Sequence, residues 1–263
     1  MGERKKYRRG RRKKKKGGII STLILIIAIA VFCVSGYQLY KIFGGYHQGK
    51  SEYDKVREVA VHGDDKDEDE FVVDFDELKK INADTVGWIR FYPEPSQISY
   101  PLVQTTDNDL YLNRTFSANE NTVGAIFVNC DNASDFSDRN TIIYGHRMRD
   151  HSMFHDLEKY KDESFWKENP YFYIYTPDGR KLTCHIYSAG IVKDTSSTYL
   201  TQFASDEEYQ AFLNDTKRAG AYHTGVEVTT DQRVVTLSTC TAASDDNRMV
   251  VRGVIESEDV VKK

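Results

Sequence analysis

Cysteine and proline are scarce in this chain, which has four cysteines and five prolines among 263 residues. So few prolines leave no proline-rich linker, and no internal repeat is visible in the sequence. Cys33 lies within a long apolar run, so the rest of the chain holds Cys130, Cys184 and Cys240. Because this number is odd, at least one of them is unpaired within the chain or pairs between chains.

Charge is absent from residues 17–40, where the run "IISTLILIIAIAVFCV" is long enough to cross about 30 Å of hydrocarbon as a helix. Eleven Lys or Arg residues lie between Arg4 and Lys16, although the whole chain carries a formal net charge of -4. Basic flanks stay on the cytoplasmic side of a membrane. The sequence therefore predicts a basic cytoplasmic tail (1–16), a single transmembrane anchor (17–43) and an extracellular remainder.

Two other interpretations of this N-terminal region are weaker. A cleaved signal peptide has a similar basic start, but no A-x-A-like cleavage site follows Val34. A basic tract also binds nucleic acid, yet this one adjoins a membrane span, so anionic lipid headgroups are the simpler partner. We expect membrane lipids as a partner through the anchor, and no nucleic acid.

The extracellular part divides into an acidic stalk and a folded domain. Residues 44–70 show no sustained apolar period and include the tract "DDKDEDE", which is typical of a solvated stalk. Residues 71–263 form the predicted domain, with a barrel or sandwich of eight short strands rich in β-branched and aromatic residues. These strands are expected at residues 85–91, 100–104, 124–130, 141–144, 171–176, 181–191, 233–240 and 249–255.

Turn and helix signals separate the strands. "YTPDGRKLT" predicts a hairpin around Asp178 and Gly179. Asp74 with Glu77, and Ser205 with Glu208, are capping-box pairs that predict two helices, the second ending at Gly220. Further helical segments are expected in "SMFHDLEKY" and "DESFWKENP".

The stretch "VVTLSTC" reads as a strand that delivers the Cys240 thiol to its end, where the polar segment "TAASDDN" follows. Buried cysteine is the commoner state, and Cys130 and Cys184 lie in apolar strand-like runs that favour packing. A nucleophilic cysteine needs a proton-exchanging group and a donor for the oxyanion. His146 is the best-placed histidine, because "NTIIYGH" brings its imidazole to the end of another predicted strand.

Arg248 is the predicted oxyanion donor. It lies eight residues after Cys240, at the start of the next strand, so a hairpin returns it to the thiol. Arg252 has the same strand parity but lies about 13 Å further along. The alternative for Arg248 is a surface ion pair with Asp245 or Asp246.

"TLSTC" with an arginine eight residues later, "NTIIYGH" about a hundred residues upstream and the basic, apolar N-terminus resemble the sortases, the cell-wall transpeptidases of Gram-positive bacteria. The helix predicted before the cysteine strand resembles class B members. The resemblance implies an eight-stranded sortase-type β-barrel with peripheral helices. It also implies catalytic roles for His146, Cys240 and Arg248, and substrate-binding roles for the following residues: Asn108, Tyr144, Tyr199, Leu200 and Ser238.

The implied reaction is cleavage of a C-terminal sorting signal after threonine through a thioacyl intermediate, with transfer to a peptidoglycan amine. The expected partners are surface proteins with such a signal and a lipid-linked precursor or cross-bridge amine. No cofactor is implied, and no metal, since His146 and Cys240 are single ligands and the acidic tract is a solvated run. Two alternatives stay open: a surface cysteine protease that hydrolyses the same intermediate, and a non-catalytic adhesion or sensor domain with Cys240 in a disulfide.

Overall fold

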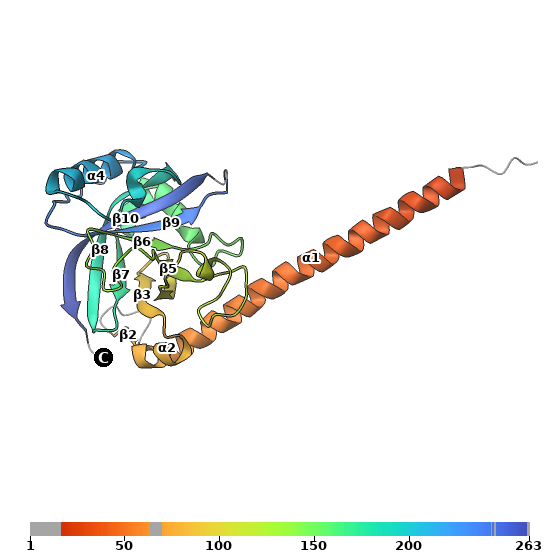
Figure 1. The fold of residues 1–263 in the computed structure, drawn as a ribbon, viewed down its shortest axis with the longest axis horizontal. Helices are drawn as coiled ribbons and strands as arrows, with labels where there is room; N and C mark the ends of the chain where they lie inside the picture. Colours follow the sequence, from red (N-terminus) through yellow and green to blue (C-terminus); the bar gives the residue numbers. More distant parts are fainter. Residues whose placement is uncertain (1–16, 64–69, 243, 245, 262–263) are drawn as a thin grey trace, which may run out of the picture. The chain divides into compact units, whose positions relative to one another are not determined.

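A closed β-barrel of eight strands forms the folded domain in the computed structural model (Figure 1). The structure describes residues 17–63, 70–242, 244 and 246–261. Around the barrel the strands run in the order β10-β8-β7-β3-β4-β5-β6-β9, and β9 pairs with β10 to close it. Two neighbouring pairs, β4 with β5 and β6 with β9, are parallel, and the other pairs are antiparallel.

All eight predicted strands are present, which confirms the mainly β fold. They are β3 (Thr85–Phe91), β4 (Ser99–Val103), β5 (Ile126–Val128), β6 (Asn140–Tyr144), β7 (Tyr171–Tyr175), β8 (Arg180–Lys193), β9 (Val234–Cys240) and β10 (Asn247–Val260). A separate two-stranded sheet pairs β1 (Val61–His62) with β2 (Val72–Val73). The helices are α1 (Gly17–Ala60), α2 (Phe75–Ile81), α3 (Glu163–Glu168), α4 (Asp206–Arg218) and the 3₁₀ turns η1 (Leu110–Leu112), η2 (His155–Lys161) and η3 (Ser197–Tyr199).

The predicted caps and turn have the expected local chemistry. The Asp74 carboxylate accepts a hydrogen bond from the Glu77 amide at the start of α2, and the Ser205 hydroxyl accepts one from the Glu208 amide at the start of α4. Gly179 has φ +88°, which the turn between β7 and β8 requires and which glycine adopts without steric cost. Short sequence signals thus specify the ends of these elements.

The helix α4 covers the outside of the barrel over β9 and β10. Tyr209, Phe212 and Leu213 of this helix form a second buried apolar cluster with Val234 of β9 and Val254 of β10. The main core fills the barrel interior. Burial of apolar surface on both faces of β9 and β10 fixes these strands in place.

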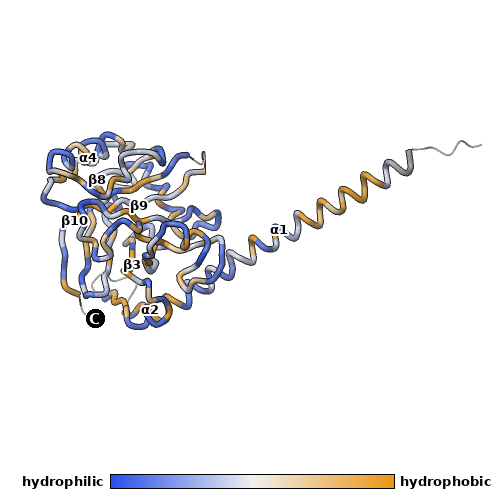
Figure 2. Tube along the Cα trace, viewed as in Figure 1, coloured by the Kyte–Doolittle hydropathy of each residue, from blue (hydrophilic) through white to orange (hydrophobic). Residues whose placement is uncertain are grey.

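The first part of α1 is long and apolar enough to cross a membrane (Figure 2). Its N-terminal location suits either a membrane anchor or a signal sequence. The predicted basic tail, residues 1–16, lies outside the described residues, as does most of the acidic tract of the stalk.

The last turns of α1 belong to the compact unit that runs from Gly45 to Lys263. Tyr53, Val56 and Ala60 form one helical stripe that is buried in the main core. The Tyr53 hydroxyl donates to the Gly124 carbonyl at 2.7 Å and accepts from the Phe116 amide at 3.2 Å. The sequence places residues 44–70 in a stalk, whereas residues 45–60 are packed onto the domain through this stripe.

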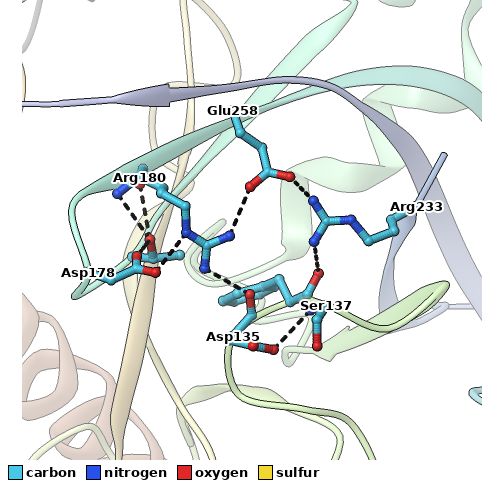
Figure 3. A network of polar contacts seen from close by, with 8 residues as sticks. Asp135, Ser137, Asp178, Arg180, Arg233 and Glu258 are labelled. Carbon is cyan, nitrogen blue, oxygen red and sulfur yellow. Dashed lines mark hydrogen bonds and ion pairs between the residues drawn. The ribbon is translucent and has the colours of Figure 1, made fainter.

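A polar network lies at one end of the barrel, next to the start of β9 (Figure 3). Arg180 contacts Asp178 at 2.7 Å and Glu258 at 2.9 Å, and Glu258 also pairs with Arg233. Arg233 in turn donates to the Phe136 carbonyl at 2.6 Å. These contacts join β8, β9 and β10 at the end of β9 that lies opposite Cys240.

Removal of the Tyr53 hydroxyl tests whether the end of α1 stabilises the domain. Tyr53→Phe leaves the Gly124 carbonyl and the Phe116 amide without this partner inside the protein. We expect the free energy of unfolding to fall by about 1–3 kcal/mol. Urea unfolding of the full chain in detergent measures this change.

The fluorescence of Trp88 and Trp166 reports the transition, because both tryptophans lie in the compact unit. Tyr40→Phe is the matched control, since Tyr40 lies on the same helix and is 76% exposed. Equal unfolding midpoints for the two variants would show that the hydrogen bonds of the Tyr53 hydroxyl do not stabilise the domain.

Candidate active site

The register of three neighbouring strands brings Cys240, His146 and Arg248 to one end of the barrel. β6 and β9 are parallel, with Tyr144 opposite Ser238, so His146 and Cys240 each follow two residues later. β10 is antiparallel to β9 and places Arg248 directly opposite Cys240. Side chains of directly opposite residues lie on the same face of a sheet. The thiol, imidazole and guanidinium therefore lie at the same end of the barrel, although His146 is 94 residues before Cys240 in the sequence.

These three residues line a single open pocket of about 240 Å³. Three of the predicted substrate-binding residues, Asn108, Tyr144 and Ser238, line the same pocket. The remaining lining residues are Leu112, Phe127, Gly145 and Thr239. Cys240 is exposed, so its sulfur is accessible to a ligand in this pocket.

The Leu112 carbonyl fixes the tautomer of His146. His146 Nε2 lies 2.6 Å from the Leu112 oxygen, and a carbonyl only accepts hydrogen bonds. Nε2 therefore carries a hydrogen, which leaves Nδ1 as the nitrogen that exchanges a proton. η1 ends at Leu112, so this short turn orients the imidazole.

Gly124 packs directly against the imidazole. It has φ +66°, and a Cβ placed there would lie 2.7 Å from His146 Cδ2 and 2.8–2.9 Å from the carbonyls of Tyr111 and Leu112. Only glycine combines this backbone conformation with this lack of space. The same glycine accepts the hydrogen bond from Tyr53, so the end of α1 supports the wall behind His146.

Arg248 is half-buried beside the pocket and held by contacts from both sides. Its Nη2 lies 3.8 Å from Asp194 Oδ2, and its Nη1 donates to the Asn247 carbonyl at 3.1 Å. Asp194 follows β8, whose Val192 pairs with Arg248. Of the two partners considered from sequence, Asp245 lies outside the described residues; the described ion pair of Arg248 is with Asp194.

A chain of amides connects Asn108 to Tyr144. The Asn108 oxygen accepts from the Cys130 amide at 2.9 Å, and its Nδ2 donates to Asn129 Oδ1 at 3.4 Å. Asn129 Nδ2 contacts the Tyr144 hydroxyl at 3.3 Å. Burial raises the pKa of Tyr144 to about 12. Because its hydroxyl oxygen accepts from Asn129, the hydroxyl hydrogen can donate to a ligand.

Tyr199, the last residue of η3, contacts two residues that line the pocket. Its hydroxyl lies 2.9 Å from Ser238 Oγ, and its ring stacks on Tyr144 with a centroid separation of 6.2 Å. Burial raises the pKa of Tyr199 as well. Tyr199 and Leu200 are not among the described residues that line the pocket, and Leu200 is 42% exposed.

Two buried polar residues hold η3 in place. Asn140 of β6 donates to the Thr198 carbonyl at 3.2 Å and the Leu200 carbonyl at 2.8 Å, and accepts from Thr236 at 2.8 Å. Arg252 donates to Thr198 Oγ1 at 2.7 Å and Ser188 Oγ at 3.1 Å, and it is completely buried. Arg252 thus supports the wall that carries Tyr199.

All four cysteines are free, so Cys240 is in no disulfide. Cys184 is buried, and burial raises its pKa far above the ordinary range of thiols. Cys130 is half-buried. Of the three cysteines in the barrel domain, only Cys240 combines exposure with the pocket that also holds an imidazole and a guanidinium.

An exposed thiol that shares a pocket with an imidazole and a guanidinium, at one end of a closed β-barrel, has the groups that cysteine-dependent acyl transfer requires. The sortase domain family model matches residues 94–256. Sortase B of Listeria monocytogenes is 31% identical over 242 residues, which cover 88% of this chain and 94% of that protein. The chain therefore belongs to the sortase family, and it is a cysteine transpeptidase of class B.

Solved structures support the same assignment. Sortase B from B. anthracis is 32% identical with a TM-score of 0.70, covering 84% of this chain and 100% of that one. The Staphylococcus aureus sortase B–substrate complex is 34% identical with a TM-score of 0.65, covering 72% of this chain and 85% of that one. The match confirms the eight-stranded barrel with helices.

Substitution of Gly124 tests whether the wall behind His146 positions the imidazole. Gly124→Ala places a methyl group against His146, and displacement of a reacting group by about 1 Å can cost up to about 100-fold in rate. We expect a loss of transpeptidation rate of this order. Gly225→Ala is the matched control, because Gly225 also has positive φ (+75°) but has open space around it.

Both variants strain a backbone with positive φ, but Gly124→Ala adds close contacts and should lower the melting temperature more than Gly225→Ala. The rates are therefore compared at a temperature at which both variants are folded. If Gly124→Ala retains the transpeptidation rate of Gly225→Ala, the contact with His146 does not position the imidazole.

Proposed function

We propose that this sortase cleaves a C-terminal sorting signal after threonine and transfers the protein to a peptidoglycan amine, with Cys240 as the nucleophile. The Cys240 thiolate attacks the threonine carbonyl carbon, and the tetrahedral adduct collapses to a thioester as the amine of the next residue departs. The acceptor amine then attacks the thioester, which forms a new amide and releases the thiolate. The single pocket shared by Cys240, His146 and Arg248 carries this proposal.

His146 is the proposed acid and base of both halves of the reaction. Its Nδ1 gives a proton to the departing amine and later takes one from the acceptor amine, while Nε2 stays bound to the Leu112 carbonyl. General acid–base catalysis of this type is worth roughly 10²–10⁴ in rate. The fixed tautomer supports this role, because the ring does not need to reorient between the two steps.

Arg248 is the proposed donor to the oxyanion of both tetrahedral adducts. It is directly opposite Cys240 on the neighbouring strand, and its contact with Asp194 holds the guanidinium at the pocket. The loss of one such donor commonly costs about 3 kcal/mol of transition-state stabilisation. A guanidinium also supplies several N–H groups in a planar arrangement, which suits an oxygen that changes geometry during the reaction.

The sorting signal is proposed to bind along Asn108, Tyr144, Tyr199, Leu200 and Ser238. The first two and Ser238 line the pocket, and Tyr199 contacts Ser238 directly. Leu200 is exposed beside η3 and would contact a longer peptide outside the pocket. The similarity to the Staphylococcus aureus sortase B–substrate complex supports the placement of a peptide on this face.

The apolar part of α1 is proposed to anchor the enzyme with its N-terminus in the cytoplasm and its barrel outside the cell. The basic segment before α1 supports this orientation. An anchored enzyme shares one surface with a membrane-retained protein and a lipid-linked amine, which raises their effective concentration. The proposed partners are therefore surface proteins with a sorting signal, a peptidoglycan amine and membrane lipids.

Competition between water and an amine distinguishes transfer from hydrolysis. The full chain in detergent is incubated with a peptide that carries a sorting signal, with and without triglycine as the amine, and the products are separated by mass spectrometry. We expect the amide product to replace the free acid as triglycine increases, because the amine intercepts the thioester. Free acid as the only product at every amine concentration would instead identify a hydrolytic protease.

A further inference from the structure

The loop that follows His146 brings two further histidines and a buried aspartate together. His151, His155 and Asp156 each offer one ligand atom, and these atoms lie within 4.8 Å of one another. None of the three lines the Cys240 pocket. The proposed transfer reaction uses none of them, so their convergence has no explanation in that chemistry.

Asp156 supplies a carboxylate in a place where charge is costly. Its side chain is only 3% exposed, and a buried carboxylate requires charged or hydrogen-bonding partners. Lys159 Nζ lies 2.9 Å from Oδ2, which compensates one oxygen. The other oxygen, Oδ1, lies 3.4 Å from His151 Nδ1. Oδ1 is therefore the carboxylate oxygen that remains for an ion between the side chains.

His155 is already oriented as a metal ligand would be. Its Nδ1 contacts the Met148 carbonyl, and since a carbonyl only accepts, Nδ1 carries the hydrogen. Nε2 then holds the lone pair. Metal-binding histidines commonly donate their second nitrogen to a backbone carbonyl in this way, which fixes the tautomer and the ring orientation. The His151 and His155 rings are adjacent, with centroids 4.1 Å apart.

The chemistry and spacing of these groups favour zinc. Bonds of about 2.0–2.1 Å in a tetrahedral site place neighbouring ligand atoms about 3.3 Å apart. The observed 3.4 Å between His151 Nδ1 and Asp156 Oδ1 matches this edge. Two imidazoles and one carboxylate, with water in the fourth position, form a known type of zinc site, whereas Ca²⁺ and Mg²⁺ prefer oxygen ligands. We propose that His151, His155 and Asp156 form a zinc site, with water as the fourth ligand.

A zinc ion at this site would cross-link the loop that follows His146, the proposed catalytic histidine. The Phe154 amide donates to the His146 carbonyl at 2.9 Å, and Arg147 forms an isolated bridge with Met153. Both connections lie between His146 and His155. Zinc would join the exposed middle of the loop, at His151, to its buried end at Asp156. Zinc binding would therefore stabilise the backbone next to the Cys240 pocket.

Zinc titration of the full chain tests this site without any measurement of activity. The parent protein carries Cys240→Ala, which removes a thiolate that would itself bind zinc, and it is studied in detergent by isothermal titration calorimetry. We expect one equivalent of Zn²⁺ to bind. His151→Ala and His155→Ala should each weaken binding by roughly 10–100-fold or more, since even loss of an outer-shell partner has that effect.

His223→Ala is the matched control, because His223 is exposed and lies outside the cluster. It should bind zinc as the parent does. His151 is 67% exposed, so its replacement should leave folding intact, and circular dichroism of each variant checks this. Absence of zinc binding by the parent, or equal binding by His151→Ala, His155→Ala and the parent, would overturn the proposed site. The result does not depend on whether Cys240 performs transfer or hydrolysis.

Discussion

The pairing of β9 with a parallel strand on one side and an antiparallel strand on the other is the constraint on which the site depends. The parallel pairing with β6 brings His146 to the end of the strand that carries Cys240. The antiparallel pairing with β10 brings Arg248 back to the same place. A shift of one residue in either register would turn a side chain to the opposite face of the sheet. Closure of the barrel prevents such shifts, because every strand is paired on both sides.

Buried polar residues convert this register into a shaped pocket. Asn140 and Arg252 have no exposed surface, and both bind the segment that carries Tyr199. A guanidinium is costly to bury, and the described partners of Arg252 are hydroxyl groups rather than a carboxylate. We interpret Arg252 as a residue that positions η3. Its directional hydrogen bonds specify the location of η3 more precisely than apolar packing would, which offsets the cost of burying the guanidinium.

The sequence predicted the strands well because each is a short β-branched or aromatic run bounded by turn residues. Gly179 and the helix caps at Asp74 and Ser205 act through neighbouring residues, so their structures follow from local sequence. The convergence of Cys240 and Arg248 was predictable for the same reason, since a hairpin joins consecutive strands. To predict that His146 lies near Cys240, one must also assume that the ends of two non-consecutive strands lie side by side.

Features that depend on distant contacts were not predictable in this way. The main difference between the prediction and the structure is the residue at which the folded domain begins. The helical spacing of Tyr53, Val56 and Ala60 was a sequence signal for a buried helix face before residue 71. His146 is oriented by the backbone carbonyl of Leu112, and a backbone contact cannot be recognised from the residue type at that position. The roles of Asn140 and Arg252 likewise depend on where η3 folds back. The proposed zinc ligands are close in sequence, yet only the folded loop brings their ligand atoms within 4.8 Å of one another.

The most direct test of the central claim is peptide mapping of the acyl-enzyme. The full chain is quenched in acid shortly after it meets a sorting peptide, and the modified cysteine is located by mass spectrometry. The account predicts a thioester to threonine on Cys240, formed far more slowly in Arg248→Ala than in Arg218→Ala, a change at an exposed arginine of α4. An adduct on another cysteine, or equal rates in the two variants, would contradict it.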